Sequence, residues 1–204
     1  MKDKLIIIGA SGHGKVVADI AAYTYKKIFF LDDNECIRKC AEYPVIDVTR
    51  NVNKYIKNSD IFVAVGNTEI RKRIVEQLEK LETEIPVLIH PQAVIGKRVS
   101  IGKGTVVMAG AVINTETVIG KACIVNTCSS VDHDSRISDY VHIAVGAHLA
   151  GTVSVGSKTW IGAGAIVSNN VSIASKCMIG AGAVVVKNIS DSGVYVGVPA
   201  KRIK

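Results

Sequence analysis

The chain has 204 residues, of which 48% are hydrophobic and only 5% aromatic, and its formal net charge is +7. This length suits one or two compact domains with a substantial core. Lysines and arginines are scattered and few aromatics accompany them, which disfavours nucleic-acid binding and fits a phosphate-bearing small molecule better. No apolar stretch is long enough for a signal peptide or membrane span, and five cysteines fit a reducing compartment, so we expect a cytoplasmic protein without a membrane partner.

Residues 1–90 alternate between expected strands and helices. Apolar runs predict strands at 5–8, 28–31, 61–65 and 86–89, with helices at 16–22 and 69–81. This order predicts a small Rossmann-like parallel sheet with ligand-binding groups at the carboxyl ends of its strands.

A glycine-rich loop, Gly9-Ala-Ser-Gly-His-Gly14, follows the first expected strand. It places backbone N–H groups at the start of a helix, where phosphate binds, and Asp32 or Asp33, about twenty residues further on, could hold a ribose. The alternative is that the glycines only form a tight turn, because their spacing is not G-x-G-x-x-G. A nicotinamide dehydrogenase is disfavoured because this unit is too short for a complete dinucleotide fold.

From Ile95 to Val185, every sixth residue is Ile, Leu or Val at sixteen consecutive positions. This period predicts a parallel β-helix over residues 91–190, with about three hexapeptides in each coil and residues 191–204 as a C-terminal tail. Glycine often follows the aliphatic residue, where we expect a positive φ angle. The residue four positions after the aliphatic one is small or β-branched and is expected to fill the corners of the coil.

Two histidines, His133 and His142, interrupt the repeat. A lone surface histidine would carry no function, but Asp134 follows His133, and a carboxylate beside an imidazole fixes its tautomer and raises its basicity. Gly151 lies one coil after His133, so we expect it to stack beside His133 at about 4.8 Å with its N–H open to a ligand. A base beside an oxyanion donor is the arrangement that acyl transfer requires.

The sequence resembles the hexapeptide-repeat sugar acetyltransferases of the NeuD and PglD type. The resemblance is carried by Gly9-Ala-Ser-Gly-His-Gly14, Phe30-Leu-Asp-Asp33, Gly66-Asn67, Asn126-Thr-Cys-Ser-Ser130, His133, His142 and Gly197-Val-Pro-Ala-Lys-Arg202. It implies a left-handed β-helix, a homotrimer, and acetyl-CoA bound between neighbouring β-helices.

The same resemblance implies roles for individual residues. His133 would be the general base, Asp134 would increase its basicity, and His142 and Gly151 would contact acetyl-CoA. The nucleotide or sugar would be held by Ser11, Gly12, His13, Asp32, Asp33 and Gly66. The nucleophile would attack the thioester directly, without an acyl-enzyme. Separately, a groove between two neighbouring β-helices would need small residues along the pantetheine of CoA. We expect Ala163 and Ala181, one coil apart, to be such residues.

The expected reaction is N-acetylation of the amine of a UDP-linked 4-amino-4,6-dideoxysugar. O-acetylation of sialic acid or another glycan precursor is the alternative, because one base can activate either nucleophile. A zinc enzyme such as a β-helical carbonic anhydrase is disfavoured and no metal is expected, since His142 and His148 are six residues apart and fall on successive faces. A non-catalytic scaffold or sugar-nucleotide sensor is a third reading, against which His133, Asp134 and Gly151 argue.

Overall fold

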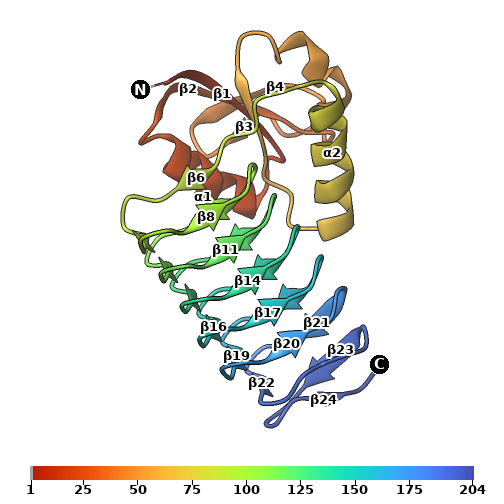
Figure 1. Ribbon diagram of the computed structural model, residues 1–204. Helices are drawn as coiled ribbons and strands as arrows, with labels where there is room; N and C mark the ends of the chain where they lie inside the picture. Colours follow the sequence, from red (N-terminus) through yellow and green to blue (C-terminus); the bar gives the residue numbers. More distant parts are fainter. Residues whose placement is uncertain (1) are drawn as a thin grey trace. The chain divides into compact units, whose positions relative to one another are not determined.

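The computed structural model describes residues 2–204, which divide into two compact units, the first ending at Leu88 and the second beginning at Ile89. The first contains helices and a parallel sheet, and the second is a stack of short strands (Figure 1). Among the described residues no helix is long and apolar enough to span a membrane.

The first unit is a five-stranded sheet in the order β3-β4-β2-β1-β5. Its strands are β1 (Lys2–Ile8), β2 (Tyr25–Leu31), β3 (Lys39–Cys40), β4 (Tyr43–Asp47) and β5 (Asp60–Val63). Its helices are α1 (Gly12–Ala21), the 3₁₀ helix η1 (Thr49–Lys54) and α2 (Thr68–Lys80). All neighbouring strands are parallel except β3, which is antiparallel to β4. This is the Rossmann-like sheet that the alternation of elements predicts.

Strand β1 lies inside the sheet, between β2 and β5. Leu5, Ile6 and Ile7 are completely buried, as expected for a parallel strand covered on both faces. The chain continues from β1 to β2 on one side and later returns to β5 on the other. The carboxyl ends of β1 and β5 therefore form a topological switch point, where open α/β sheets bind ligands.

Two details of the first unit differ from expectation. The predicted strand at 86–89 is reduced to β6 (Leu88–Ile89), which ends the longest sheet of the β-helix. Strands β3 and β4 and the helix η1 were not expected. Strand β4 contains Pro44 and alternates between half-buried and exposed residues, so it lacks the continuous apolar run that identifies a central parallel strand.

The second unit is a parallel β-helix with three faces, each named here by one of its strands. The β13 face contains β7 (Val94–Ile95), β10 (Val112–Ile113), β13 (Ser130–Val131), β16 (His148–Leu149), β19 (Ile166–Val167) and β22 (Val184–Val185). The β14 face contains β8 (Ser100–Ile101), β11 (Val118–Ile119), β14 (Arg136–Ile137), β17 (Ser154–Val155) and β20 (Ser172–Ile173). The β15 face contains β6, β9 (Val106–Val107), β12 (Ile124–Val125), β15 (His142–Ile143), β18 (Trp160–Ile161), β21 (Cys177–Ile179), β23 (Gly193–Val196) and β24 (Lys201–Arg202).

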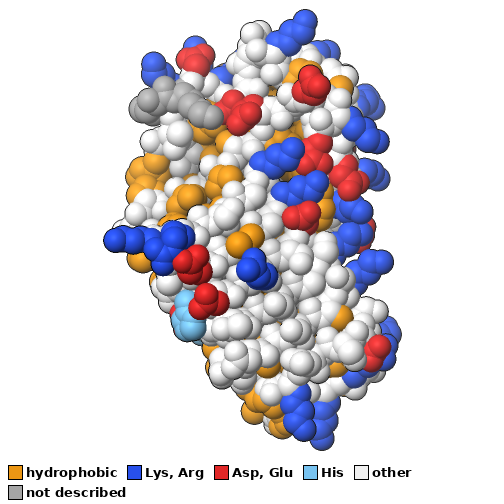
Figure 2. Space-filling model, viewed as in Figure 1, with side chains coloured by type: hydrophobic (Ala, Val, Ile, Leu, Met, Phe, Trp, Pro, Cys, Tyr) orange, Lys and Arg blue, Asp and Glu red, His pale blue; other side chains and the backbone are white. Residues whose placement is uncertain are grey.

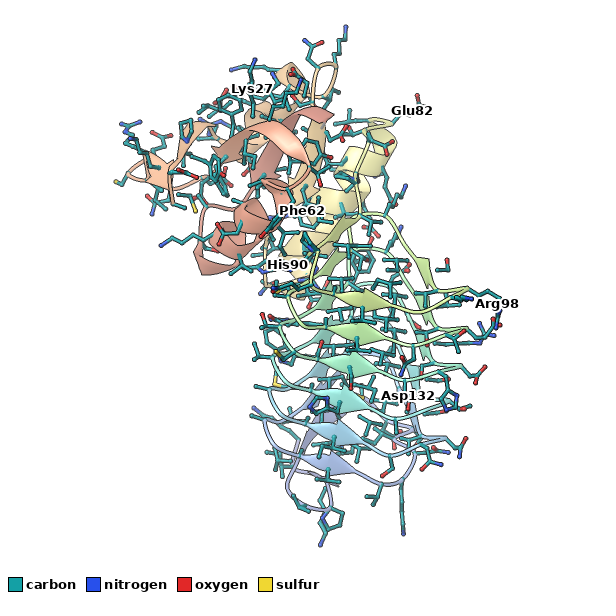
Figure 3. All side chains as sticks on the ribbon, turned by 90° about the vertical axis from the view of Figure 1, so that its left-hand side faces the viewer. Lys27, Phe62, Glu82, His90, Arg98 and Asp132 are labelled. Carbon is teal, nitrogen blue, oxygen red and sulfur yellow. The ribbon has the colours of Figure 1, made fainter. Side chains whose placement is uncertain are left out.

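Residues that face one another in adjacent coils are eighteen positions apart, as in the pairing of Ile113 with Val131. Figure 3 shows the coils stacked along one axis. The repeated aliphatic residues from Val107 to Val185 form one buried core, and Ile95 and Ile101 pack partly buried against it. The buried hydroxyl of Thr105 is satisfied at its corner, since Oγ1 donates to the Gly120 carbonyl at 2.8 Å and accepts from the Cys123 N–H at 3.0 Å.

The expected positive φ angles at the glycines after the aliphatic residues were wrong. The left-handed conformation occurs three residues after the aliphatic residue, and mostly at residues other than glycine: Arg98, Gly104, Gly110, Glu116, Ala122, Cys128, Asp134, Tyr140, Gly146, Thr152, Lys158, Gly164, Asn170, Lys176 and Gly182. The glycines that follow the aliphatic residues serve close approach instead. A Cβ on Gly102 would lie 2.6 Å from the carbonyl carbon of Gly120 in the next coil.

The C-terminal residues extend the β15 face. Strand β23 pairs in parallel with β21, and β24 pairs antiparallel with β23. Residues 193–202 are therefore part of the second unit.

Candidate active site

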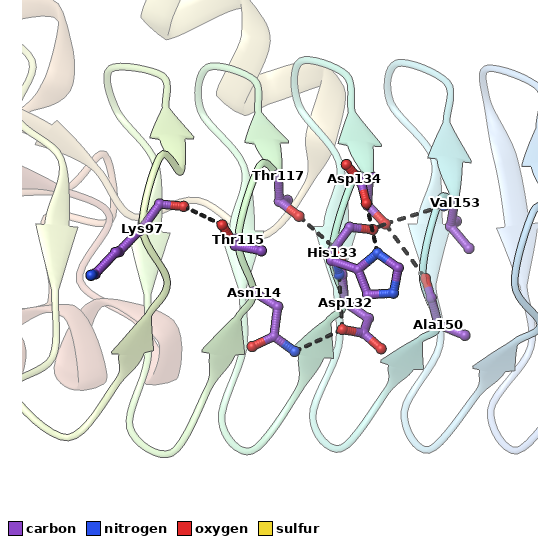
Figure 4. Close-up of polar contacts among 10 residues, drawn as sticks. Lys97, Asn114, Thr115, Thr117, Asp132, His133, Asp134, Ala150 and Val153 are labelled. Carbon is purple, nitrogen blue, oxygen red and sulfur yellow. Dashed lines mark hydrogen bonds and ion pairs between the residues drawn. The ribbon is translucent and has the colours of Figure 1, made fainter.

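His133 and Asp134 lie in the turn that follows β13 (Figure 4). Nδ1 of His133 is 2.7 Å from Oδ2 of Asp134, and the two side chains are 52% and 56% exposed. The hydrogen bond with Asp134 is the largest cause that raises the pKa of His133 above its ordinary value of 6.5, and the charges of Asp132 and Asp134 add to it. Because the contact engages Nδ1, Nε2 of the neutral ring is left to accept a proton.

Gly151 lies directly against the imidazole of His133, one coil further along. A Cβ on Gly151 would lie 2.6 Å from Nε2 and 2.7 Å from Cε1 of His133. The Gly151 carbonyl accepts from the Asn170 N–H at 3.0 Å, and its own N–H donates to none of the described residues. The two residues are thus adjacent, Gly151 is buried, and the imidazole fills the space that a Cβ at residue 151 would take.

Asp132 and Asn114 belong to the same cluster and were not expected. Oδ1 of Asp132 accepts from the backbone N–H of His133 at 2.8 Å and from Nδ2 of Asn114 at 2.7 Å. These bonds lower the pKa of Asp132, with that of Asn114 the larger cause. Both residues follow an aliphatic residue of the repeat, and a polar side chain at that position of two successive coils was the available signal.

His142 lies on a different face from His133. It is 7% exposed and belongs to β15, where its ring centroid is 4.2 Å from that of Trp160 at an interplanar angle of 48°. Its Nε2 is 3.2 Å from Nδ2 of Asn126. Asn126 and Trp160 complete this cluster and were not expected to be near His142, although both lie about one coil from it in the sequence.

Ala163 and Ala181 lie in the turns that follow the β15 face. Both are exposed, and the Gly182 N–H donates to the Ala163 carbonyl at 2.8 Å, which confirms that their coils are adjacent. They therefore follow the same face as His142, whereas His133 and Gly151 lie in the turns that follow the β13 face. The residues expected around acetyl-CoA are therefore divided between two corners of the β-helix. One is the corner after the β13 face, with His133, and the other is the corner after the β15 face, which follows His142.

The glycine-rich loop of the first unit contains two kinds of glycine. Gly9 has a φ of +107°, and a Cβ there would lie 2.7 Å from the Ala64 carbonyl oxygen, while a Cβ on Gly14 would overlap the Gly9 carbonyl oxygen. A Cβ on Gly12 or on Gly66 would meet nothing within 4 Å. The fold itself therefore requires Gly9 and Gly14, and it leaves the surroundings of Gly12 and Gly66 open.

His13 and Arg71 form the interior of this site. The Nε2 atom of His13 is buried and has no hydrogen-bond partner among the described residues. Burial, and then the charge of Arg71, lower the pKa of His13 to about 4. Arg71 is 1% exposed and donates from Nη1 to the carbonyls of Val65 at 2.9 Å and Gly66 at 2.8 Å. The positive charge behind the loop thus belongs to Arg71, and His13 is neutral near pH 7.

Asp32, Asp33 and Ser11 lie around the same edge of the sheet. Asp32 accepts from the N–H groups of Ala10 at 2.7 Å and Asn34 at 2.8 Å, and Asp33 accepts from the Thr49 N–H at 2.9 Å. Ser11 precedes α1, is exposed and makes no side-chain cap. The two carboxylates therefore fix loops of the protein itself and have further lone pairs for a ligand.

A cleft of about 270 Å³ lies beside Asp32, at the carboxyl ends of β2 and β4. Sequence reasoning missed it because part of its lining comes from β4 and η1, which were not expected, and most of the rest comes from the segment that follows β2. The lining includes Arg38, Asp47, Arg50 and Asn51.

The charges on the face drawn in Figure 2 are not gathered in one patch. Lysine and arginine side chains are interspersed there with aspartate and glutamate. Among residues 2–204, no three His, Cys, Asp or Glu side chains are grouped as metal ligands would be.

The comparisons with known proteins agree with both units. Residues 4–78 match the family model of the PglD N-terminal domain. The acetyltransferase domain of PglB from Neisseria gonorrhoeae FA1090, solved in complex with acetyl coenzyme A, is 43% identical, covers 100% of both chains and superposes with a TM-score of 0.96. PerB from Caulobacter crescentus, solved with CoA and GDP-perosamine, is 33% identical over 98% of this chain and 97% of its own, with a TM-score of 0.89.

A UDP-N-acetylbacillosamine N-acetyltransferase of Bacillus subtilis (strain 168) is 37% identical over 109 residues. The matched segment is 50% of this chain, and this chain spans about half the length of that relative. With a Rossmann-like first unit, a β-helix whose coils follow the hexapeptide repeat, and a full-length match to a solved acetyltransferase domain, the chain belongs to the hexapeptide-repeat sugar acetyltransferases of the NeuD and PglD type.

Proposed function

We propose that the protein transfers the acetyl group of acetyl-CoA to the amine of a nucleotide-linked amino sugar. The observation that carries this proposal is the His133–Asp134 pair lying against Gly151. The names of the relatives support the same chemistry, since one is an N-acetyltransferase and another was solved with CoA and a nucleotide-linked amino sugar.

The proposed reaction is a direct transfer. Nε2 of His133 accepts a proton from the sugar amine as the amine nitrogen bonds to the thioester carbonyl carbon. The carbon–sulfur bond then breaks, and the imidazolium gives the proton to the departing CoA thiolate. Asp134 holds the other ring nitrogen and stabilises the imidazolium. The Gly151 N–H, which has no partner among the described residues, is our candidate donor to the developing oxyanion.

The proposed acetyl-CoA site needs a second copy of the chain. His133 is half-exposed, and the contacts expected from His142, Ala163 and Ala181 follow a different face. Acetyl-CoA that touches both groups is most simply bound between the His133 corner of one protomer and the His142 corner of its neighbour. Half-exposed aliphatic side chains on the β-helix, among them Val145, Ile166 and Met178, support such packing. We therefore propose a homotrimer.

The nucleotide is proposed to bind the first unit. Gly12 and Gly66 flank the switch point between β1 and β5, and the backbone at the start of α1 suits a phosphate. Ser11 and His13 belong to the same loop, and Asp32 and Asp33 would meet the ribose at the end of β2. We propose UDP as the nucleotide and a 4-amino-4,6-dideoxysugar as the sugar. The free thiols of all five cysteines support a cytoplasmic protein.

The experiment is a panel of acceptors incubated with the purified chain and acetyl-CoA, with CoA release followed and products identified by mass spectrometry. UDP- and GDP-linked 4-amino sugars, CMP-sialic acid and free sialic acid form the panel. Turnover with the UDP-amino sugar and an alkali-stable amide product supports the proposal. An alkali-labile ester on sialic acid would assign O-acetylation instead, and no turnover with any acceptor would favour the scaffold reading.

A further inference from the structure

The carboxylate of Asp132 is held by two hydrogen bonds, and its backbone makes two more. Its carboxylate accepts from the His133 N–H and from Asn114, its own N–H donates to the Leu149 carbonyl at 2.9 Å, and its carbonyl accepts from Thr117 Oγ1 at 2.9 Å (Figure 4). Figure 3 places Asp132 at the same edge of the stacked coils as Arg98.

Asp132 is also exceptional within the repeat. Of the sixteen residues that directly follow the repeated aliphatic positions, it is the only one with a charged side chain. Several of the others are glycines whose Cβ would collide with the next coil. A charge at this crowded position therefore needs a reason beyond packing.

Asn126 shows that the local hydrogen bond does not need a charge. It occupies the equivalent position of another hexapeptide, and its Oδ1 accepts from the Thr127 N–H at 2.8 Å, as Asp132 accepts from the His133 N–H. An amide can thus make the same backbone contact. The carboxylate of Asp132 adds a negative charge, and an acceptor oxygen replaces the amide NH2 group. That charge is one of the causes that raise the pKa of His133.

The other charged residues near His133 do not take the place of the Asp132 charge. Asp134 binds Nδ1 from the same turn. Glu116, one coil before Asp134, is paired with Arg98, and Lys97 lies two coils before His133. Arg136 follows on β14 with an exposed side chain, and the next coil brings only Gly151 and Thr152. Asp132 is therefore the second carboxylate next to the base, and Asn114 holds it in place.

We propose that Asp132 is a positioning residue for His133, which fixes its backbone and supports the imidazolium with a second negative charge. When His133 takes the proton of the nucleophile, the ring gains a positive charge, which Asp134 meets at Nδ1 and Asp132 meets through space. This inference rests on the proposed function, in which His133 is the general base.

The test compares Asp132→Asn, Asp132→Ala and the wild-type chain. The pKa of His133 is measured by NMR from its Cε1–H resonance, which His133→Ala identifies, and kcat/KM is measured as a function of pH. Removing the negative charge of Asp132 is expected to lower the pKa of His133 by about half a pH unit and the high-pH plateau of kcat/KM by up to about threefold. In Asp132→Ala, which also loses the contact with the His133 backbone N–H, kcat/KM is expected to fall further.

Asp139→Asn is the matched control. Oδ1 of Asp139 accepts from the Lys121 N–H at 2.9 Å, so this change removes a carboxylate from a similar backbone contact in a turn after the β14 face. It leaves both readouts at the wild-type value. If Asp132→Asn also leaves both unchanged, whether or not Asp132→Ala fails, the charge has no role and the proposal is wrong. The NMR measurement needs no turnover, so a chain without acetyltransferase activity would overturn the proposed function while still deciding the effect of Asp132 on the ring.

Discussion

The imidazole of His133 covers Gly151 so closely that a Cβ on Gly151 would lie 2.6 Å from its Nε2. The glycine thus sets where the base can lie, because any side chain at 151 would displace the ring. The neighbouring carboxylates of Asp132 and Asp134 hold the same histidine from its backbone and from Nδ1. Three residues within one coil of His133 therefore determine its position.

Gly151→Ala should reduce activity without unfolding the protein. The new Cβ meets a side chain that can move away, so we expect the His133 ring to shift, kcat to fall about tenfold or more, and the melting temperature to stay close to that of the wild type. Gly156→Ala is the contrasting variant, because its Cβ would overlap the backbone of Ser175 in the next coil. A large loss of stability is expected there. Equal activity of Gly151→Ala and the wild type would contradict this account.

Asp134→Asn should lower the pKa of His133, because the hydrogen bond with Asp134 is the largest cause that raises it. The plateau of kcat/KM at high pH falls because the base is weaker, and the rise of activity begins at a lower pH. For stability, a raised pKa means that the contact contributes below 6.5, the ordinary value of histidine, and that this contribution is lost as the pH rises through the raised value. A pH profile identical to that of the wild type would refute the role of Asp134.

Gly12→Leu should weaken nucleotide binding while the fold persists. A Cβ at residue 12 meets nothing within 4 Å, so the larger leucine side chain is expected to project into the proposed phosphate site. Calorimetry with UDP, which tests binding without turnover, should show at least a tenfold weaker interaction than in the wild type. Gly14→Ala is the structural counterpart, and it should lower stability because its Cβ overlaps the Gly9 carbonyl. Unchanged UDP affinity in Gly12→Leu would place the nucleotide elsewhere.

Arg71→Leu should destabilise the first unit. The change removes a buried guanidinium and leaves the carbonyls of Val65 and Gly66 without their donor, at an expected loss of about 3 kcal/mol in the free energy of unfolding. It should also raise the pKa of His13 from about 4, because the charge of Arg71 is one of the causes that lower it. Chemical denaturation and an NMR titration measure the two effects. A His13 pKa that does not rise would show that burial alone sets it.

Much of the fold could be predicted from the sequence, because a period of six leaves few alternatives to a parallel β-helix and a buried run such as Leu5–Ile8 is typical of a central parallel strand. The role of the repeat glycines could not, since close approach between coils and a positive φ angle both favour glycine. Strand β4 could not be predicted either, because Pro44 and the alternation of half-buried and exposed residues weaken the pattern of a parallel strand.

Only part of the candidate site could be predicted from the sequence as well. The neighbourhood of His133 and Gly151 followed from counting one coil, whereas Asp132, Asn114 and the Trp160 ring over His142 depend on how side chains of successive coils turn toward one another. The cleft beside Asp32 depends on a strand and a 3₁₀ helix that the pattern did not reveal.

The central claim is that His133 is the base of an acetyl transfer to an amino sugar. The most direct measurement is the rate of CoA release from acetyl-CoA for the wild type and for His133→Ala. It is made at about pH 7.5 with the UDP-linked amino sugar that the wild type acetylates fastest. Loss of a positioned general base typically costs about 10²- to 10⁴-fold, and we predict a fall in kcat of that size with little change in KM. A His133→Ala variant that keeps the wild-type kcat would contradict the claim.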